Sequence, residues 1–350
     1  MTDYLMNAWY MGAWCNEVTE KPMSRRLLGV NTLFYRKTDG TVVALRDRCP
    51  HRFAPLSKGK VINDQIQCPY HGLVFDGTGQ CVANPITSDT RIPEAVRVQR
   101  FPVVEQSNIV WFWPGDPAKC DTSPIPQFPY LSDNMTYKHV YGLTPVKAHF
   151  ELETDNLMDL SHVDMVHPGF SGVFNKTSKY TAGRNGNTVF SNWVTTDAKN
   201  APVMEQTSFP TNGAPIDQWL EMSWQPPGAM YLEVAVTRTG EPRSAGYSLK
   251  SVHILTPETE HDTHYFWSAA IYSHEHVPLD LFRAGFNNAF DFEDKPMIEA
   301  VAAEMGDEID LLSMKPLLLR SDAGSVLARR VLKELIAKEK QEYYQYDRVG

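Results

Sequence analysis

The first third of the chain alternates short apolar runs with turn residues. The runs are rich in β-branched and aromatic side chains, and they lie at residues 32–35, 41–45, 61–62 and 109–113. The turns at residues 38–40 and 76–79 contain glycine, which accepts a positive φ. This pattern is typical of antiparallel strands joined by hairpins. Residues 1 to about 115 are therefore predicted to form a small antiparallel β domain.

A proline-rich segment follows this predicted domain, with prolines at positions 114, 117, 124, 126 and 129. Each proline fixes φ and removes a backbone donor, so residues 114–130 are predicted to be an irregular connection. The chain has 350 residues, which favours two domains on a prior of roughly 150 residues each. We place the first domain at residues 1–117 and the second at residues 118–350.

The remaining pattern mixes two periodicities. Residues 187–270 alternate as strands do, whereas residues 150–167, 280–312 and 321–340 show helical spacing of apolar positions. The predicted fold class is therefore α+β, with an N-terminal antiparallel β domain followed by a domain of antiparallel sheet and helices.

Composition narrows the class of protein. Hydrophobic residues make up 42% of the chain and charged residues 21%, which is ordinary for a globular protein. The net charge of −9 argues against binding to a nucleic-acid backbone. No apolar stretch approaches the ~20 residues that cross a membrane, and no basic segment precedes an apolar run as in a signal peptide. We therefore expect a cytoplasmic protein without nucleic-acid or membrane partners.

Two mixed cysteine–histidine motifs carry the strongest chemical signal. Cys49-Pro-His51 is followed, after sixteen residues, by Cys68-Pro-Tyr-His71. Each half offers one thiolate and one imidazole on a short loop. Two such loops can supply two cysteines to one iron and two histidines to the other, which is the ligation of a Rieske [2Fe–2S] cluster.

A tetrahedral Cys₂His₂ zinc site is the alternative. Zinc motifs usually place two cysteines in one half and two histidines in the other, whereas both halves are mixed here. The five cysteines are an odd number, so a disulfide framework is also disfavoured. The [2Fe–2S] cluster is the favoured interpretation.

A second metal site is indicated by His162 and His167. On an ideal helix, residues five apart lie about 140° apart, so the two imidazoles can converge only if the helix is distorted or ends between them. Pro168 favours such an end, because the residue before proline is pushed out of helical geometry. Two surface histidines near acidic residues are the alternative, which becomes less favoured in a chain that already carries a cluster.

Two histidines and one carboxylate form the facial triad of non-haem Fe(II) oxygenases, which leaves positions open for O₂. The carboxylate must come from elsewhere in the chain, since Asp159 is better placed to support a metal ligand than to bind the metal itself. Asp291 and Asp294 are the candidates.

These motifs resemble the Rieske non-haem iron oxygenases, and in particular their aromatic O-demethylase branch, which includes the dicamba and vanillate O-demethylase oxygenases. The resemblance runs nearly end to end, through residues 7–10, 49–56, 68–73, 155–167, 253–259 and 293–295. It implies that His162, His167 and Asp294 bind the iron. It also implies that Asp159 bridges the two metal centres of neighbouring subunits and that Asn156 lies near the iron.

The same resemblance implies a helix-grip catalytic domain and a homotrimer in which electrons cross a subunit interface. It places His253, Leu232 and Gly285 in the substrate pocket. The dicamba enzyme has an asparagine and a tryptophan where this chain has Leu232 and Gly285, so dicamba itself is not the expected substrate.

The expected activity is that of the terminal oxygenase of a multicomponent monooxygenase. Electrons would come from an NAD(P)H-dependent reductase, directly or through a ferredoxin, because this chain has no Gly-x-Gly-x-x-Gly motif of its own. The oxygenase would hydroxylate an O-methyl, N-methyl or methyl group of a small aromatic substrate, and attack at an O- or N-methyl would release formaldehyde. A cis-dihydroxylating dioxygenase and a Rieske electron carrier are the alternatives.

Overall fold

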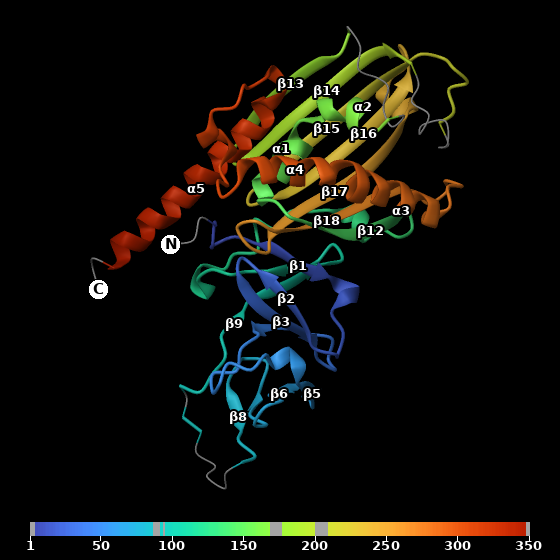
Figure 1. Cartoon of the computed structure of the whole chain (residues 1–350). Coiled ribbons are helices and arrows are strands. Elements are labelled where there is room, and N and C mark those ends of the chain that lie inside the picture. The colour runs from blue at the N-terminus through green and yellow to red at the C-terminus, as the bar shows by residue number, and fades with distance from the viewer. Residues whose placement is uncertain (1–3, 87–91, 94, 169–176, 200–208, 348–350) are drawn as a thin grey trace. The chain divides into compact units, whose positions relative to one another are not determined.

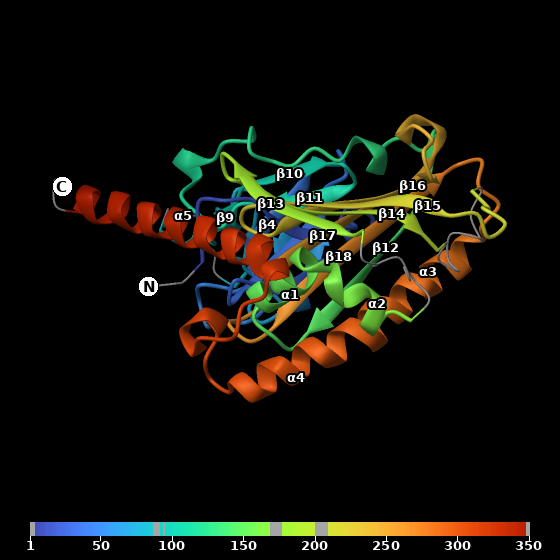
Figure 2. The same cartoon turned by 90° about the horizontal axis from the view of Figure 1, so that it is seen from above.

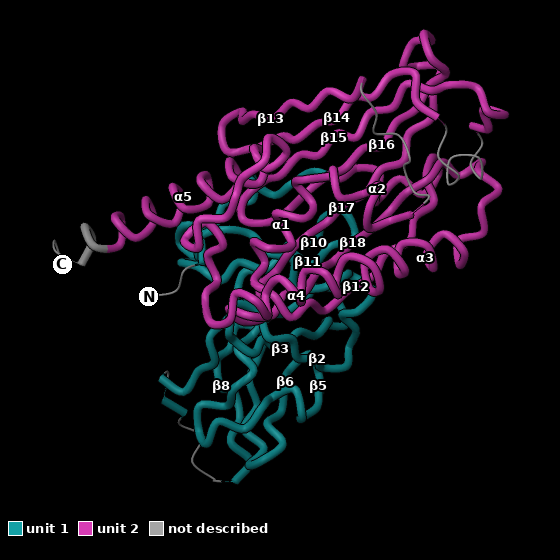
Figure 3. The backbone as a smooth tube through the Cα atoms, turned by 45° about the horizontal axis from the view of Figure 1, so that its top comes forward, with its two compact units in different colours: residues 1–127 teal, residues 128–350 magenta. Residues whose placement is uncertain are grey.

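The chain forms two compact units, Met1–Gln127 and Phe128–Gly350, which are coloured separately in Figure 3. The computed structural model describes residues 4–86, 92–93, 95–168, 177–199 and 209–347. The boundary that the sequence predicted after residue 117 falls inside the first unit.

The N-terminal unit is built from short antiparallel strands in three sheets, as the hairpin pattern predicted. One sheet has the order β1-β11-β10, the second β2-β3-β4-β9 and the third β5-β6-β7-β8 (Figure 1). Their bounds are Tyr10–Trp14 (β1), Met23–Leu27 (β2), Val30–Arg36 (β3), Val42–Arg46 (β4), Lys60–Ile62 (β5), Gln65–Gln67 (β6), Val74–Phe75 (β7), Cys81–Ala83 (β8), Arg100–Phe101 (β9), Val103–Gln106 (β10) and Ile109–Phe112 (β11).

The turn between β7 and β8 shows why glycine is required there. The Gly79 amide donates to the carbonyl of Asp76 over 2.9 Å, and Gly79 has a φ of 84°. A Cβ at this position would lie 2.1 Å from the carbonyl oxygen of Val98. Both the left-handed backbone and the close approach exclude a side chain.

The C-terminal unit contains a seven-stranded antiparallel sheet with the order β12-β18-β17-β16-β15-β14-β13. Its strands are long, and several alternate buried with less buried residues as a sheet packed on one face does. The bounds are Tyr137–Val146 (β12), Lys179–Asn185 (β13), Thr188–Ala198 (β14), Ile216–Gln225 (β15), Ala229–Arg238 (β16), Tyr247–Pro257 (β17) and Thr263–Tyr272 (β18).

Helices cover one face of this sheet, as Figures 1 and 2 show for α1, α3 and α4. The helices are Phe150–Met158 (α1), Val163–Val166 (α2), Leu279–Asn287 (α3), Lys295–Met305 (α4) and Ala323–Asp347 (α5). A π-helical turn, Asn288–Asp294, joins α3 to α4. The predicted helix at 280–312 is therefore interrupted and ends early, because Gly306 has a φ of 65° and leaves helical geometry.

The α+β fold class is confirmed, with the antiparallel β unit first and the sheet-and-helix unit second. Across the described part of the chain, no helix is both long and apolar enough to cross a membrane.

Candidate metal centres and substrate cavity

The two cysteine–histidine loops of the N-terminal unit have the same backbone construction. Cys49 donates its amide to the carbonyl of Ala54 and accepts from the amide of Phe53. Cys68 stands in the same relation to Leu73 and Gly72. The fourth residue after each cysteine has a positive φ, 62° in Phe53 and 77° in Gly72. The two loops therefore present their ligands in equivalent ways.

The thiols and imidazoles of these loops differ in burial. Both cysteines are 2% exposed, and burial raises the pKa of the Cys49 thiol to about 11. The rings of His51 and His71 lie 4.5 Å apart at the more exposed end of the loops. Two buried thiols beside two more exposed imidazoles suit a cluster that is enclosed at its cysteine end and reachable at its histidine end.

The spacing of these side chains also bears on the zinc alternative. Tetrahedral zinc at roughly 2.0–2.3 Å from each ligand would draw all four ligand atoms to within about 4 Å of one another. All four residues are described, and no three of their ligand atoms lie within 4.8 Å of one another. Four ligands shared between two irons need no such convergence, so the donor set fits a [2Fe–2S] cluster.

In the C-terminal unit, a broken helix brings the second pair of histidines together. Helix α1 ends at Met158, and Asp159 leaves helical geometry with φ −112° and ψ 85°. A 3₁₀ turn, Leu160–His162, and then α2 follow, and His167 ends α2 with φ −113° and ψ 76°. The predicted helix end at His167, before Pro168, is confirmed, and it lets side chains five residues apart face the same point.

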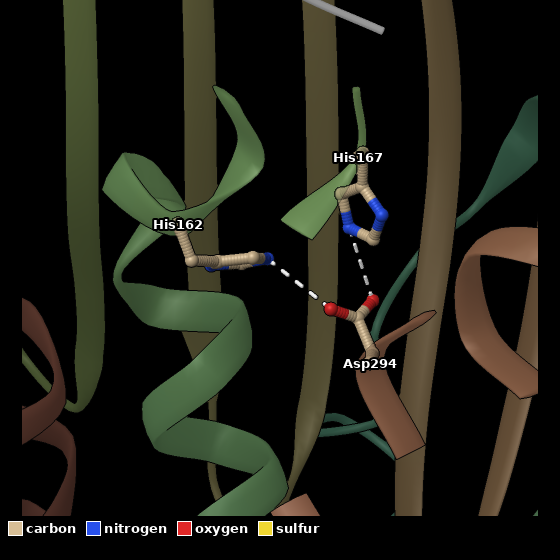
Figure 4. Close-up of side chains that lie close together, drawn as sticks. All are labelled: His162, His167 and Asp294. Carbon is tan, nitrogen blue, oxygen red and sulfur yellow. Dashed lines mark ion pairs between the residues drawn. The ribbon is translucent and has the colours of Figure 1, made fainter. Parts of the chain in front are cut away.

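The carboxylate of Asp294 completes this group, as Figure 4 shows. Its Oδ1 lies 3.5 Å from Nε2 of His162, and its Oδ2 lies 3.2 Å from Nε2 of His167. One ligand atom from each of the three residues lies within 4.8 Å of the other two. Asp291, which the sequence left as an alternative, is not in this group. Two imidazoles and one carboxylate around a common point fit a non-haem Fe(II) site with open positions.

The far nitrogen of each imidazole is held by a second partner. Nδ1 of His162 lies 2.6 Å from the backbone oxygen of Asp159, and Nδ1 of His167 lies 2.7 Å from Oε2 of Glu293. Such partners fix the tautomer and leave Nε2 free for an ion. The sequence did not assign this role to Glu293, although an acidic residue beside a candidate ligand was a usable signal.

Helix α1 supplies further polar groups near Asp294. The Asn156 side-chain amide donates to Oδ1 of Asp294 over 3.3 Å, which agrees with its predicted place beside the iron ligands. Glu153 is fully buried, and burial with the charge of Asp294 raises the pKa of its carboxyl well above the usual range. The Asp159 carboxylate accepts from the Ser161 amide and is not part of the three-residue group.

A buried ion cluster, which the sequence analysis did not predict, anchors α1. Arg329 on α5 donates to Glu151 over 2.7 Å and to Asp155 over 2.7 and 2.9 Å. The Arg329 side chain is 1% exposed. Since partners so far apart in sequence meet only through helix packing, no local pattern could have identified them.

An apolar cavity of about 280 Å³ opens beside the three-residue group. His253, Leu232 and Gly285, the three predicted pocket residues, all line it together with His162, His167 and Asp294. Ser251 also lines it and was missed. Since Ser251 and His253 are two apart on β17, strand periodicity places them on one face and could have found it.

Comparison with known proteins agrees with both centres. The Rieske [2Fe-2S] domain model matches residues 8–102, and the model for the vanillate O-demethylase oxygenase C-terminal domain matches residues 146–338. The oxygenase component of dicamba O-demethylase from Stenotrophomonas maltophilia is 35% identical over 336 residues, which are 95% of this chain and 98% of that protein.

Two further similarities cover almost the whole chain. The oxygenase component of chloroacetanilide N-alkylformylase from Rhizorhabdus wittichii strain DC-6 is 34% identical over 348 residues, 96% of this chain and 97% of that protein. The crystal structure of dicamba monooxygenase bound to 3,6-dichlorosalicylic acid matches with a TM-score of 0.87 at 34% identity, covering 96% of this chain and 99% of that one.

A cluster-binding β domain joined to a domain with a two-histidine, one-carboxylate site defines an oxygenase component of the Rieske type. The chain belongs to the family of Rieske non-haem iron oxygenases, in the branch with the vanillate O-demethylase oxygenase C-terminal domain.

Proposed function

We propose that this chain is the terminal oxygenase of a multicomponent system that removes a methyl group from the oxygen or nitrogen of a small aromatic substrate. The observation that carries the proposal is the group of His162, His167 and Asp294 at the wall of an apolar cavity, in a chain that also has a Rieske domain. Its similarity to O-demethylase and N-dealkylating oxygenase components supports dealkylation over ring dihydroxylation.

His162, His167 and Asp294 would hold a mononuclear Fe(II), and Cys49, His51, Cys68 and His71 would hold the [2Fe–2S] cluster. When bound, these two groups would supply electron transfer and O₂ activation beside the cavity. Glu293 and the backbone oxygen of Asp159 keep the two ligating imidazoles in the orientation that points Nε2 toward the ion.

The remaining residues around the cavity position the substrate and exclude water. Leucine, isoleucine, valine, alanine and phenylalanine side chains form most of its wall, which keeps competing water away from the reacting carbon. The Asn156 amide holds one oxygen of Asp294 by its hydrogen bond and so fixes the position of the carboxylate. Loss of this bond would let the carboxylate rotate away from His162.

Asp159 is placed to act at a contact with a second copy of the chain. Its carboxylate is only partly buried, and within its own chain it accepts from the Ser161 amide. We assign it to bridge the iron site of one subunit and the cluster of the next. A head-to-tail contact of this kind closes into a ring, which we propose to be a homotrimer. A cytoplasmic NAD(P)H-dependent reductase, with or without a ferredoxin, would be the electron donor.

A product assay tests the proposal. The purified oxygenase, a surrogate reductase and NADH are incubated with methoxy- and N-methyl-arenes, and formaldehyde and the demethylated product are quantified. We expect the two to form in equal amounts. A cis-diol without formaldehyde would instead establish a dihydroxylating dioxygenase, and the Asp294→Asn protein provides the matched control for release that does not depend on the site.

A further inference from the structure

One wall of the substrate cavity carries a line of three hydrogen-bonded side chains. Oγ of Ser251 lies 2.9 Å from Nε2 of His253, and Nδ1 of His253 lies 2.6 Å from the hydroxyl of Tyr265. All three residues are buried, with exposed fractions of 1–2%. Ser251 and His253 line the cavity, whereas Tyr265 lies behind them.

The direction of these hydrogen bonds follows from their partners. Among the described residues, the Tyr265 hydroxyl has no other hydrogen-bond acceptor than Nδ1 of His253, so it donates its proton there. Burial lowers the pKa of His253 to about 3, so the ring is neutral and carries its single proton on Nε2. Nε2–H then donates to Oγ of Ser251, and the Ser251 hydroxyl proton is left to point at a ligand.

Apart from the iron that His162, His167 and Asp294 would hold, the described part of the cavity wall offers no cationic side chain. None of the described residues that line it is a lysine or arginine. Lys250, next to Ser251 on β17, lies on the other face of the strand and pairs with Glu233 over 3.0 Å. Arg283, two residues before Gly285 on α3, donates to the backbone oxygen of Tyr141. Both nearby positive charges are thus committed elsewhere.

Opposite Ser251, the neighbouring strand contributes only hydrocarbon. Leu232 on β16 is the Cα partner of Ser251 on β17, and both line the cavity. An anion in this space would lose its hydration and gain only neutral hydroxyl donors, from the lining residues Ser251 and Tyr247, which leaves most of its charge uncompensated. An uncharged molecule with one acceptor satisfies the Ser251 hydroxyl and buries its remaining surface against apolar side chains.

We propose that the cavity selects an uncharged aromatic substrate that carries a hydrogen-bond acceptor for the Ser251 hydroxyl. The Ser251 hydroxyl donates to this acceptor, and the cavity rejects carboxylates. The inference rests on the proposed dealkylating function and names its substrate class. His253 and Tyr265 are positioning residues, because they act on the ligand through Ser251. The volume of about 280 Å³ exceeds the ~150 Å³ of an apolar cavity that holds benzene, so a substituted ring fits.

Three ligands of matched size test this selection. All three carry the methoxy group. They are 4-methoxyacetophenone, which is neutral with a carbonyl acceptor, 4-isopropylanisole, which is neutral with no acceptor besides the methoxy oxygen, and 4-methoxybenzoate, which is an anion. Binding to the oxidised holoenzyme is measured by calorimetry without reductase. We expect the ketone to bind at least about 100-fold more tightly than the benzoate, and about 5-fold more tightly than the isopropyl compound.

The Ser251→Ala protein should lose the preference for the ketone over the isopropyl compound, and Ser251→Thr, which keeps the hydroxyl, should restore it. Ser248→Ala is the matched control, because Ser248 is on the same strand, bonds with Tyr272 and does not line the cavity. Tighter binding of the benzoate, no binding of the ketone, or an unchanged ketone preference in Ser251→Ala would overturn the proposal.

These outcomes separate the inference from the proposed function. Formaldehyde released mainly from 4-methoxybenzoate would refute the substrate class and leave dealkylation standing. Tight binding of the ketone with the predicted Ser251 dependence, but without formaldehyde from the reduced enzyme, would support the selection and count against dealkylation.

Discussion

The carboxylate of Asp294 lies 3.2 Å from Nε2 of His167, although 127 positions separate the two residues in the chain. The other nitrogen of the same imidazole, Nδ1, contacts Glu293, so the two neighbouring acidic residues contact the two nitrogens of one ring. This arrangement needs the end of α2 and the π-helical turn before α4 to meet. It places Asp294, and not Asp291, in the group with His162 and His167.

Replacing Asp294 should therefore remove one iron and leave the cluster intact. In Asp294→Asn the amide is a poor ligand for Fe(II), so we expect the mononuclear iron to be lost while the visible absorption of the cluster is unchanged. Iron content and the absorption spectrum measure the two centres separately. Asp291→Asn is the control and should retain all its iron; loss of iron in that variant and not in Asp294→Asn would contradict the assignment.

Asp159→Asn should bind both metals and yet turn over at a small fraction of the normal rate. The asparagine side-chain oxygen can still accept from the Ser161 amide, so the backbone that carries His162 keeps its shape. What the variant loses is the negative charge assigned to the contact with the neighbouring subunit. Rapid-mixing kinetics should show a reduced cluster that no longer passes electrons to the iron, and full activity would refute the bridging role.

Replacing Arg329 should destabilise the C-terminal unit strongly. Arg329→Met leaves Glu151 and Asp155 buried without their cation, and breaking such a pair costs about 3–5 kcal/mol. Thermal or denaturant unfolding measures the change. Arg330→Met is the control, because Arg330 is exposed on the same helix and its loss should change stability by less than about 0.5 kcal/mol.

The same variant should show a pH dependence of known sign. Burial raises the pKa of Glu151 and Asp155, and Arg329 counteracts the rise in both. Without the arginine both pKa values rise further. A carboxyl group whose pKa is higher in the folded state favours folding when protonated, so the deficit of Arg329→Met should shrink as the pH falls through the raised pKa values. A deficit that grows on acidification would contradict this.

Gly285 should control the size of the cavity. A Cβ built on Gly285 meets nothing within 4 Å, and the residue lines the cavity. Gly285→Phe should fill this space and raise the KM of a para-substituted substrate about 10-fold or more, with little change in stability. Gly285→Ala should leave the KM nearly unchanged and stabilise α3 by about 0.5–1 kcal/mol. Equal KM values in the phenylalanine variant and the wild type would place the substrate elsewhere.

Local features were predictable from the sequence because local chemistry determines them. The hairpins of the N-terminal unit follow from β-branched runs and glycine turns, and the two cysteine–histidine loops follow from their spacing. The helix end at His167 was also predictable, because Pro168 follows it and a five-residue spacing does not converge on an intact helix.

The remaining features depend on packing between distant elements. Residue spacing alone left Asp291 and Asp294 equivalent, since both lie on the same late helical segment, and the π-helical turn that orients Asp294 has no clear sequence signal. The contacts of Arg329 with α1 likewise arise only when α1 and α5 pack together. The prediction carried this helix to residue 312 because it did not treat Gly306 as the helix stop, whereas α4 ends at Met305.

Metal and sulfide analysis combined with electron paramagnetic resonance tests the central claim most directly. The wild-type protein should contain about three irons and about two inorganic sulfides per chain, and the dithionite-reduced sample should give the signal of a histidine-ligated [2Fe–2S] cluster. The Asp294→Asn protein should contain about two irons with the same signal. A colourless protein that contains zinc and no sulfide would contradict the account.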